Sequence, residues 1–171
     1  LLEGGGQELV KLELIFFSGR PFEKKPLVAR VTNNLLVEGS EKVKGFELAE
    51  ELDFYGTSLE LPFNLDTGNL SLSVLSNKLN EVLELLAKAM EHPALPKKEL
   101  IALKNRSEEK LKEDIGKVDV LAYRKLTELI FGDDHPYGYN SSEVRYREIT
   151  RQDLVEHFRN CYRGENGVVI L

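Results

Sequence analysis

The sequence predicts an α+β fold: a two-layer sandwich in which a mainly antiparallel sheet carries helices packed on one face. Three observations predict it. Alternating apolar residues occur at 8–17, 58–63 and 69–74, and an apolar run occupies 167–171. Blocks of helical periodicity lie between these segments. A short turn joins the runs 58–63 and 69–74. Hairpins combined with blocks of helices are typical of sheets that are covered on one side.

The strands follow from residues that alternate with a period of two. Val10, Leu12, Leu14 and Phe16 predict a first strand over 8–17 that ends at Ser18-Gly19-Arg20-Pro21. The runs 58–63 and 69–74 flank the turn 64–68, so they predict an antiparallel hairpin. Residues 167–171, GVVIL, predict a final buried strand.

The helices follow from apolar residues that recur every three or four positions. This spacing predicts helices at 26–38, 44–54, 77–90, 97–115, 118–131 and 151–161. Pro26 suits a first helical turn, Gly39 suits a C-terminal cap, and Thr150 suits the N-cap of the last helix. Residues 132–138, GDDHPYG, predict a loop.

Composition limits the function classes. The 171 residues suit a single domain, and 29 acidic against 23 basic residues give a formal charge of −6, which argues against general binding of nucleic acid or anionic membranes. Cys161 is the single cysteine, so an intrachain disulfide and a CxxC zinc site are excluded. No apolar run approaches the length of a membrane span. The compartment stays open between cytoplasmic and periplasmic or organellar.

One helix carries a candidate site. Asp153, His157 and Cys161 are spaced by four residues, so we expect their side chains on one helical face. Such a face could hold a metal or a Cys–His dyad, but an Asp–His pair at this spacing is more commonly a surface contact. HExxH, HxxEH, GxSxG and phosphate-loop motifs are absent from the sequence.

Taken in order, six segments resemble one family. They are FFSGRPFEKK after the first strand, LVARVTNNLLVEGS (27–40), KGFELAEELDFYGTSLEL (44–61), LSLSVLSNKLNEVLELLAKAMEHP (70–93), the HPYG loop (135–138), and the segment 149–171, which runs from an Ile-Thr helix start to a terminal strand. Together the segments resemble the pitrilysin/insulinase-type zinc metallopeptidases, which include the mitochondrial processing peptidases, over nearly the whole chain. The resemblance implies their α+β half-domain fold.

The chain departs from that family at its zinc motif. In active members the helix that corresponds to 27–40 carries His-x-x-Glu-His, and this chain has Arg30, Asn33 and Asn34 at those places. A guanidinium cannot ligate zinc, and an amide cannot act as a general base near neutral pH. The family's third ligand falls near Glu109, within one or two residues. The resemblance therefore implies no catalytic residue and no zinc in this chain.

What the resemblance implies for function is a non-catalytic half. We expect a single lobe, 1–171, of an inactive-type domain that is trimmed at both ends, because the family's first strand begins earlier and its last strand continues further. Such a lobe shapes a peptide chamber and pairs with a homologous zinc-bearing half or subunit, which alone holds the zinc, and its ligand is a peptide substrate. Two alternatives stay open: a pure scaffold or assembly subunit, and an active hydrolase that uses His157 and Cys161.

Overall fold

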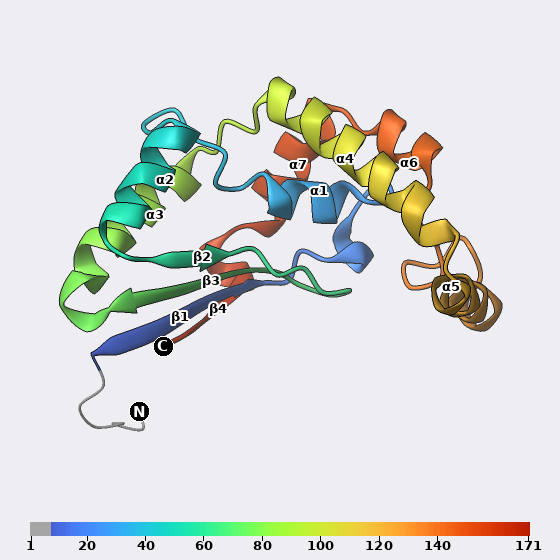
Figure 1. Cartoon of the computed structure of the whole chain (residues 1–171), viewed down its shortest axis with the longest axis horizontal. Helices are drawn as coiled ribbons and strands as arrows, with labels where there is room; N and C mark the ends of the chain where they lie inside the picture. Colours follow the sequence, from blue (N-terminus) through green and yellow to red (C-terminus); the bar gives the residue numbers. More distant parts are fainter. Residues whose placement is uncertain (1–7) are drawn as a thin grey trace.

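A computed structural model describes residues 8–171 and has the predicted α+β architecture (Figure 1). Residues 1–7 of the predicted lobe lie outside the described part. The sheet contains β1 (Leu9–Phe16), β2 (Ser58–Glu60), β3 (Gly68–Leu75) and β4 (Gly167–Ile170). Their order is β2-β3-β1-β4, and every neighbouring pair is antiparallel.

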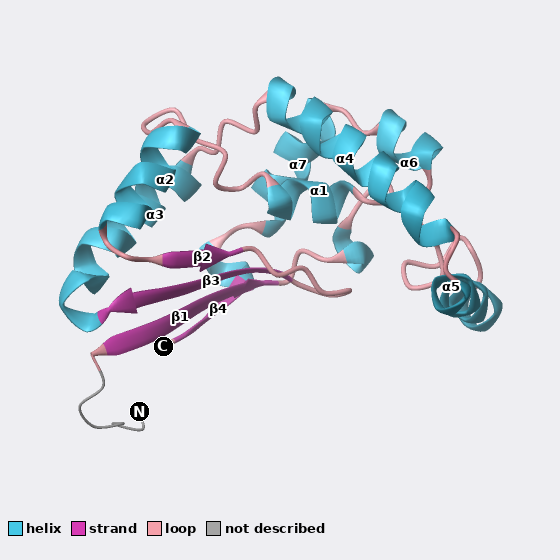
Figure 2. Ribbon diagram, in the orientation of Figure 1, coloured by secondary structure: helices cyan, strands magenta, loops and turns pink. Residues whose placement is uncertain are grey.

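The helices lie on one side of this sheet, as Figure 2 shows. They are α1 (Val28–Asn34), α2 (Gly45–Phe54), α3 (Leu79–Glu91), α4 (Lys97–Ile115), α5 (Val118–Phe131), α6 (Glu143–Glu148) and α7 (Arg151–Cys161). Helices α2 and α3 cover one end of the sheet, while α1 and α7 lie over the other end beneath α4 and α6 (Figure 1). Among residues 8–171, none of these helices combines the length and apolar character that crossing a membrane requires.

Register explains which strand residues are buried. Leu12 pairs with Leu72 and Leu14 with Leu70, so these side chains share the face that the helices cover. Lys11 and Ser73 are paired on the opposite, outer face. The predicted alternation is therefore confirmed, because one face of β1 and β3 enters the core and the other does not.

The interior is divided into two main apolar clusters. The first lies between the sheet and helices α2 and α3, and it includes Leu12, Leu72, Leu48, Val82 and Leu86. The second lies between α1, α4, α6 and α7, and it includes Leu27, Val31, Leu100, Tyr146 and Leu154. Helix α1 belongs to the second cluster, so its position is set by other helices as well as by the sheet.

Three features differ from the sequence-based expectation. Helix α1 covers 28–34 rather than 26–38. It starts late because Leu27 takes a left-handed conformation with φ of 74°, and after Asn34 the backbone continues in turns whose N–H groups bond three residues back. The predicted final strand exists, but it is not buried: Val169 is 67% exposed, since β4 is an edge strand that lies beyond the helical layer. The short helix α6 was not predicted, because six residues are too few to show a helical period.

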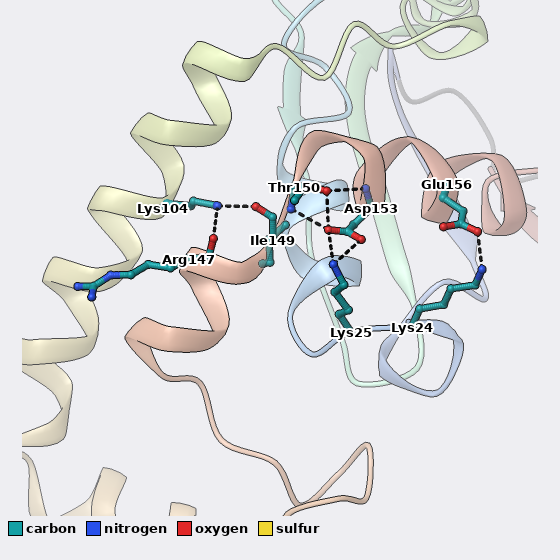
Figure 3. A network of polar contacts seen from close by, with 8 residues as sticks. All are labelled: Lys24, Lys25, Lys104, Arg147, Ile149, Thr150, Asp153 and Glu156. Atoms are coloured by element: carbon teal, nitrogen blue, oxygen red, sulfur yellow. Dashed lines mark hydrogen bonds and ion pairs between the residues drawn. The ribbon is translucent and has the colours of Figure 1, made fainter.

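Polar contacts hold the helices of the second cluster together (Figure 3). Lys104 of α4 donates to the backbone oxygens of Arg147 and Ile149, at 3.2 and 2.5 Å, where α6 ends. Thr150 and Asp153 form a capping box at the start of α7, and Lys25 reaches Asp153 at 2.8 Å. These contacts fix α7 against both α4 and the loop that precedes α1.

Candidate functional site

The candidate site is a pocket of about 390 Å³ between α1, α4, α5 and the loop 139–141. Helix α1 contributes Arg30 and Asn34, which are separated by one helical turn and therefore lie on the same face. These are two of the three residues that the resemblance assigns to the family's zinc motif. The structure thus brings Arg30 and Asn34 together in one pocket.

Helix α4 forms the opposite wall of the pocket with Ser107, Lys110, Leu111 and Asp114. Glu109, predicted at the third ligand position within one or two residues, is exposed and does not line the pocket. Its neighbour Lys110 does line it, so the α4 wall presents an ammonium group beside the position predicted for a carboxylate.

Asn33 points to the other side of α1, where it is fully buried. Its amide nitrogen donates to the backbone oxygens of Leu61 and Pro62, at 3.2 and 3.1 Å. Its amide oxygen accepts a hydrogen bond of 3.1 Å from the Tyr162 hydroxyl. The amide therefore satisfies two carbonyls that follow β2, and it is fully engaged in holding the hairpin to α1 and to the end of α7.

Gly68 allows the side chains of Asn33, Tyr162 and Ser18 to approach the backbone of β3 closely, because it has no Cβ atom. A Cβ atom at Gly68 would lie 2.4 Å from the Tyr162 hydroxyl, 2.6 Å from Ser18 Oγ and 2.7 Å from Asn33 Oδ1. The backbone N–H of Gly68 donates to Ser18 Oγ at 3.1 Å. We call Ser18, Asn33, Gly68, His157 and Tyr162 the buried hub, because each contacts another member behind α1.

His157 lies in the buried hub and not on an open face. Its Nε2 donates to the backbone oxygen of Ser18 at 3.0 Å, and its Nδ1 lies 3.8 Å from Cys161 Sγ. Burial lowers the pKa of His157, and burial raises the pKa of the Cys161 thiol. A neutral imidazole beside a protonated, buried thiol lacks the thiolate that a nucleophilic cysteine requires. Asp153, the third residue of this predicted face, instead caps α7 and pairs with Lys25.

A second group of contacts, which sequence reasoning missed, fixes the start of α1. Glu23 accepts from the Ala29 N–H at 2.9 Å and from the Tyr139 hydroxyl. The Leu27 N–H donates to the same hydroxyl at 3.1 Å. Arg20 stacks on the Tyr139 ring, 4.3 Å from its centroid. The sequence signal for these contacts was Tyr139, the second tyrosine of HPYGY, because it is a large aromatic residue in an otherwise polar loop. In the structure it is buried.

The pocket is positively charged, unlike a site that holds a zinc ion. Among residues 8–171, one carboxylate lines the pocket, that of Asp114. Four cationic side chains also line it: Arg20, Arg30, Lys110 and Arg124. Asn34 offers a weak neutral donor, and no imidazole or thiolate is among the lining residues. These side chains do not fit zinc, because catalytic zinc takes about three nitrogen, sulfur or carboxylate ligands. Within residues 8–171, no group of three or more His, Cys, Asp or Glu side chains is placed to hold a metal ion.

Comparison with solved structures identifies similar folds. The peptidase M16 inactive domain from Pseudomonas fluorescens is 25% identical with a TM-score of 0.89, and the match covers 98% of this chain and 42% of that one. A protease from Helicobacter pylori gives 15% identity and 0.85, covering 95% and 40%. Pitrilysin gives 19% identity and 0.76, covering 95% and 18%. This chain thus spans less than half the length of each of these proteins.

Sequence comparison gives the family. A search of curated proteins returned no match. The family model for insulinase, peptidase family M16, matches residues 10–131, which include the helix with Arg30, Asn33 and Asn34 and the whole of α4 and α5. The fold and the match over most of the chain agree, so this chain belongs to the insulinase family of peptidases, family M16.

Proposed function

We propose that this chain is a non-catalytic lobe of an M16 peptidase, one that forms part of the wall of a peptide chamber and pairs with a homologous half that holds the zinc. The observation that carries the proposal is the cationic pocket at the position of the family's zinc motif. Arg30 and Lys110 face this pocket where an active member needs metal ligands. In this proposal the chain binds no zinc, and the partner half supplies both the metal and the activated water.

Similarity to an inactive domain supports the non-catalytic part of the proposal. The Pseudomonas fluorescens protein, which is described as an M16 inactive domain, matches 98% of this chain. The single thiol does not offer another route, because Cys161 is buried and its pKa is raised by burial.

Helix α5 supports the pairing. None of its residues is buried, and seven large side chains along it are between 43% and 80% exposed: Val118, Leu121, Tyr123, Leu126, Leu129, Ile130 and Phe131. Figure 1 shows α5 at the far end of the helical layer, away from the sheet. Exposed apolar surface of this kind marks an interaction site. We propose that α5 packs against the homologous half.

Strand β4 supports peptide binding along the sheet. Among residues 8–171 it pairs with β1 alone, so its other edge has no strand partner within the described part of the chain. Val168, Val169 and Ile170 are 45%, 67% and 50% exposed. An open edge offers unpaired N–H and C=O groups to an extended peptide, and alternate side chains of such a peptide would meet apolar neighbours.

Co-expression with an HxxEH-bearing M16 protein of the same organism tests the proposal. We expect the two to co-elute in size-exclusion chromatography and the complex to cleave a fluorogenic unfolded peptide faster than the zinc-bearing protein alone. A chelator should abolish that activity. A complex whose activity equals that of the zinc-bearing protein alone would contradict the chamber role and favour the scaffold alternative.

Two substitutions, one on α5 and one on α2, show whether α5 is the contact surface. Leu129→Glu places a charge on α5 at a side chain that is 74% exposed, so it should weaken co-elution without unfolding the chain. Phe54→Glu is the matched control, because Phe54 is 83% exposed at the end of α2, which covers the opposite end of the sheet. Equal loss of co-elution in both variants would show that α5 is not the contact surface.

A further inference from the structure

We propose that the cationic pocket between α1, α4 and α5 binds the carboxylate of an acidic residue in a bound peptide. The proposal rests on the peptide-chamber role and adds to it a chemical class of substrate. In this proposal the pocket binds an anion where active members bind a zinc cation, since a pocket that repels a dication attracts an anion.

The charge of the pocket runs against that of the chain. The whole sequence carries a formal charge of −6, yet four basic side chains meet here with one carboxylate. That carboxylate, Asp114, is paired with Lys117 at 2.6 Å. Hence Asp114 compensates little of the positive charge that Arg30, Lys110 and Arg124 place around the pocket.

These cations are only weakly compensated: the Glu23 carboxylate acts on Arg20 and Asp114 acts on Lys110, both beyond contact distance. Among residues 8–171, none of the four has a carboxylate within 4.0 Å. Arg20 donates to the backbone oxygens of Pro136 and Tyr139, and Arg124 donates to that of Ser141 at 2.9 Å. Neutral carbonyls orient these two guanidinium groups without cancelling their charge. Arg30 lies over the Phe63 ring, 5.6 Å from its centroid, so its position is also supported by a neutral partner.

The shape and polarity of the pocket favour a peptide side chain over a small free ion. A volume of about 390 Å³ is much larger than one oxyanion needs. Its walls also contain the amide of Asn34, the hydroxyl of Ser107 and the apolar surface of Val120. Arginine binds carboxylates with two parallel hydrogen bonds, so Arg30 and Arg124 can hold an acidic head group while Val120 and Leu111 contact its methylene groups.

A pair of isosteric peptides tests the proposal. One fluorescein-labelled probe carries two adjacent glutamates between alanine and serine residues, and the other carries glutamines at the same places. We expect the glutamate peptide to bind about tenfold more tightly in fluorescence anisotropy, and the difference to shrink at high salt. An acidic chain without a cationic pocket would show the reverse order, because its net charge repels the glutamates.

Variants of matched charge locate the site. Arg30→Gln and Lys110→Gln should each weaken the glutamate peptide about fivefold and leave the glutamine peptide unchanged. Lys98→Gln is the control for Lys110→Gln, because Lys98 is exposed on the same helix and does not line the pocket. Thermal unfolding of each variant checks that the fold is intact, and Arg30→Lys, which keeps the charge but loses the paired hydrogen bonds, should lose less binding than Arg30→Gln.

The outcomes separate this inference from the proposed function. Equal binding of both peptides, or equal loss in Lys98→Gln and Lys110→Gln, would overturn the pocket and leave peptide binding by the chamber wall in place. Binding of neither peptide, with co-elution of the zinc-bearing half retained, would overturn both peptide roles and leave the pairing. Displacement of the glutamate peptide by inorganic phosphate at concentrations where acetate has no effect would assign the pocket to phosphate instead.

Discussion

The two faces of helix α1 differ in almost every physical respect. Behind the helix, Asn33 is fully buried and its amide is hydrogen-bonded on both ends, within a hub that includes Tyr162 and Gly68. In front of it, Arg30 and Asn34 line a polar pocket next to a helix, α5, that buries none of its residues. One face is tied into the core by hydrogen bonds, whereas the other faces a polar pocket.

The difference shows that neighbouring residues of one short helix can have separate roles, one in the core and two at a pocket. Asn33, which the resemblance assigns to the place of the motif's glutamate, has a structural role: it donates to the Leu61 carbonyl and supplements the Asn69 N–H at the Pro62 carbonyl. Arg30 and Asn34, which the resemblance assigns to the places of the two histidines, line the pocket. Substitutions on the two faces should therefore act on different properties.

The largest effect is expected for Asn33→Ala. This change leaves the Leu61 and Pro62 carbonyls without their side-chain donor and the Tyr162 hydroxyl without its acceptor. We expect the free energy of unfolding to fall by about 3 kcal/mol in urea titrations. Asn34→Ala, its neighbour on the front face, is the control and should change stability by less than about 0.5 kcal/mol. Similar losses in both variants would break the comparison.

Gly68→Ala should have the next largest effect. The added methyl group would lie within 2.7 Å of three polar atoms in the buried hub, on Tyr162, Ser18 and Asn33. Because these side chains are buried and bonded, we expect a loss of about 2 kcal/mol in the free energy of unfolding. Gly164→Ala provides the reference, since a Cβ there meets no atom within 4 Å. A Gly68→Ala protein as stable as wild type would mean that the hub is loosely packed.

His157 makes a smaller, pH-dependent contribution. Burial lowers its pKa below the ordinary 6.5, partly opposed by the hydrogen bond to the Ser18 carbonyl. The folded protein therefore binds fewer protons than the unfolded chain just below pH 6.5. The stability from this residue is present above pH 6.5 and is lost as the pH falls below it. The difference in unfolding free energy between wild type and His157→Gln should show this slope; a difference that is constant with pH would place His157 outside the hub.

Arg30→Gln should have the smallest effect on stability. Removing one of four neighbouring cations relieves repulsion about as much as it removes packing against Phe63, so we expect a change within about 0.5 kcal/mol. Urea unfolding of this variant, beside Asn33→Ala, measures the contrast between the two faces directly. A loss as large as that of Asn33→Ala would mean that Arg30 is structural as well.

Sequence reasoning recovered the regular elements and missed what lies between them. The periodicity of 97–115 and 118–131 gave α4 and α5 with their observed bounds, because each has caps or breakers at both ends. It did not foresee the left-handed Leu27, which depends on Tyr139, a residue more than a hundred positions away. It also treated 167–171 as buried, since an apolar run alone does not tell a central strand from an edge strand.

The resemblance selected the helix that lines the candidate pocket, but the geometry of the pocket was not predictable from the sequence. The resemblance placed Arg30, Asn33 and Asn34 at the zinc motif, yet only a three-dimensional structure shows that Asn33 turns toward Tyr162 while its neighbours face α4. The positive charge of the pocket depends on Arg20, Lys110 and Arg124, which come from three separate segments. No local pattern in the sequence links them.

The most direct test of the central claim is the zinc content of the chain. The protein should be purified without a metal-affinity tag, dialysed against trace zinc, and measured by elemental analysis. A cationic pocket at the place of the zinc motif predicts a stoichiometry near zero, unchanged in Arg30→Gln. One tightly bound zinc per chain would contradict the account, and Glu109, His157 and Cys161 would then be the first residues to substitute.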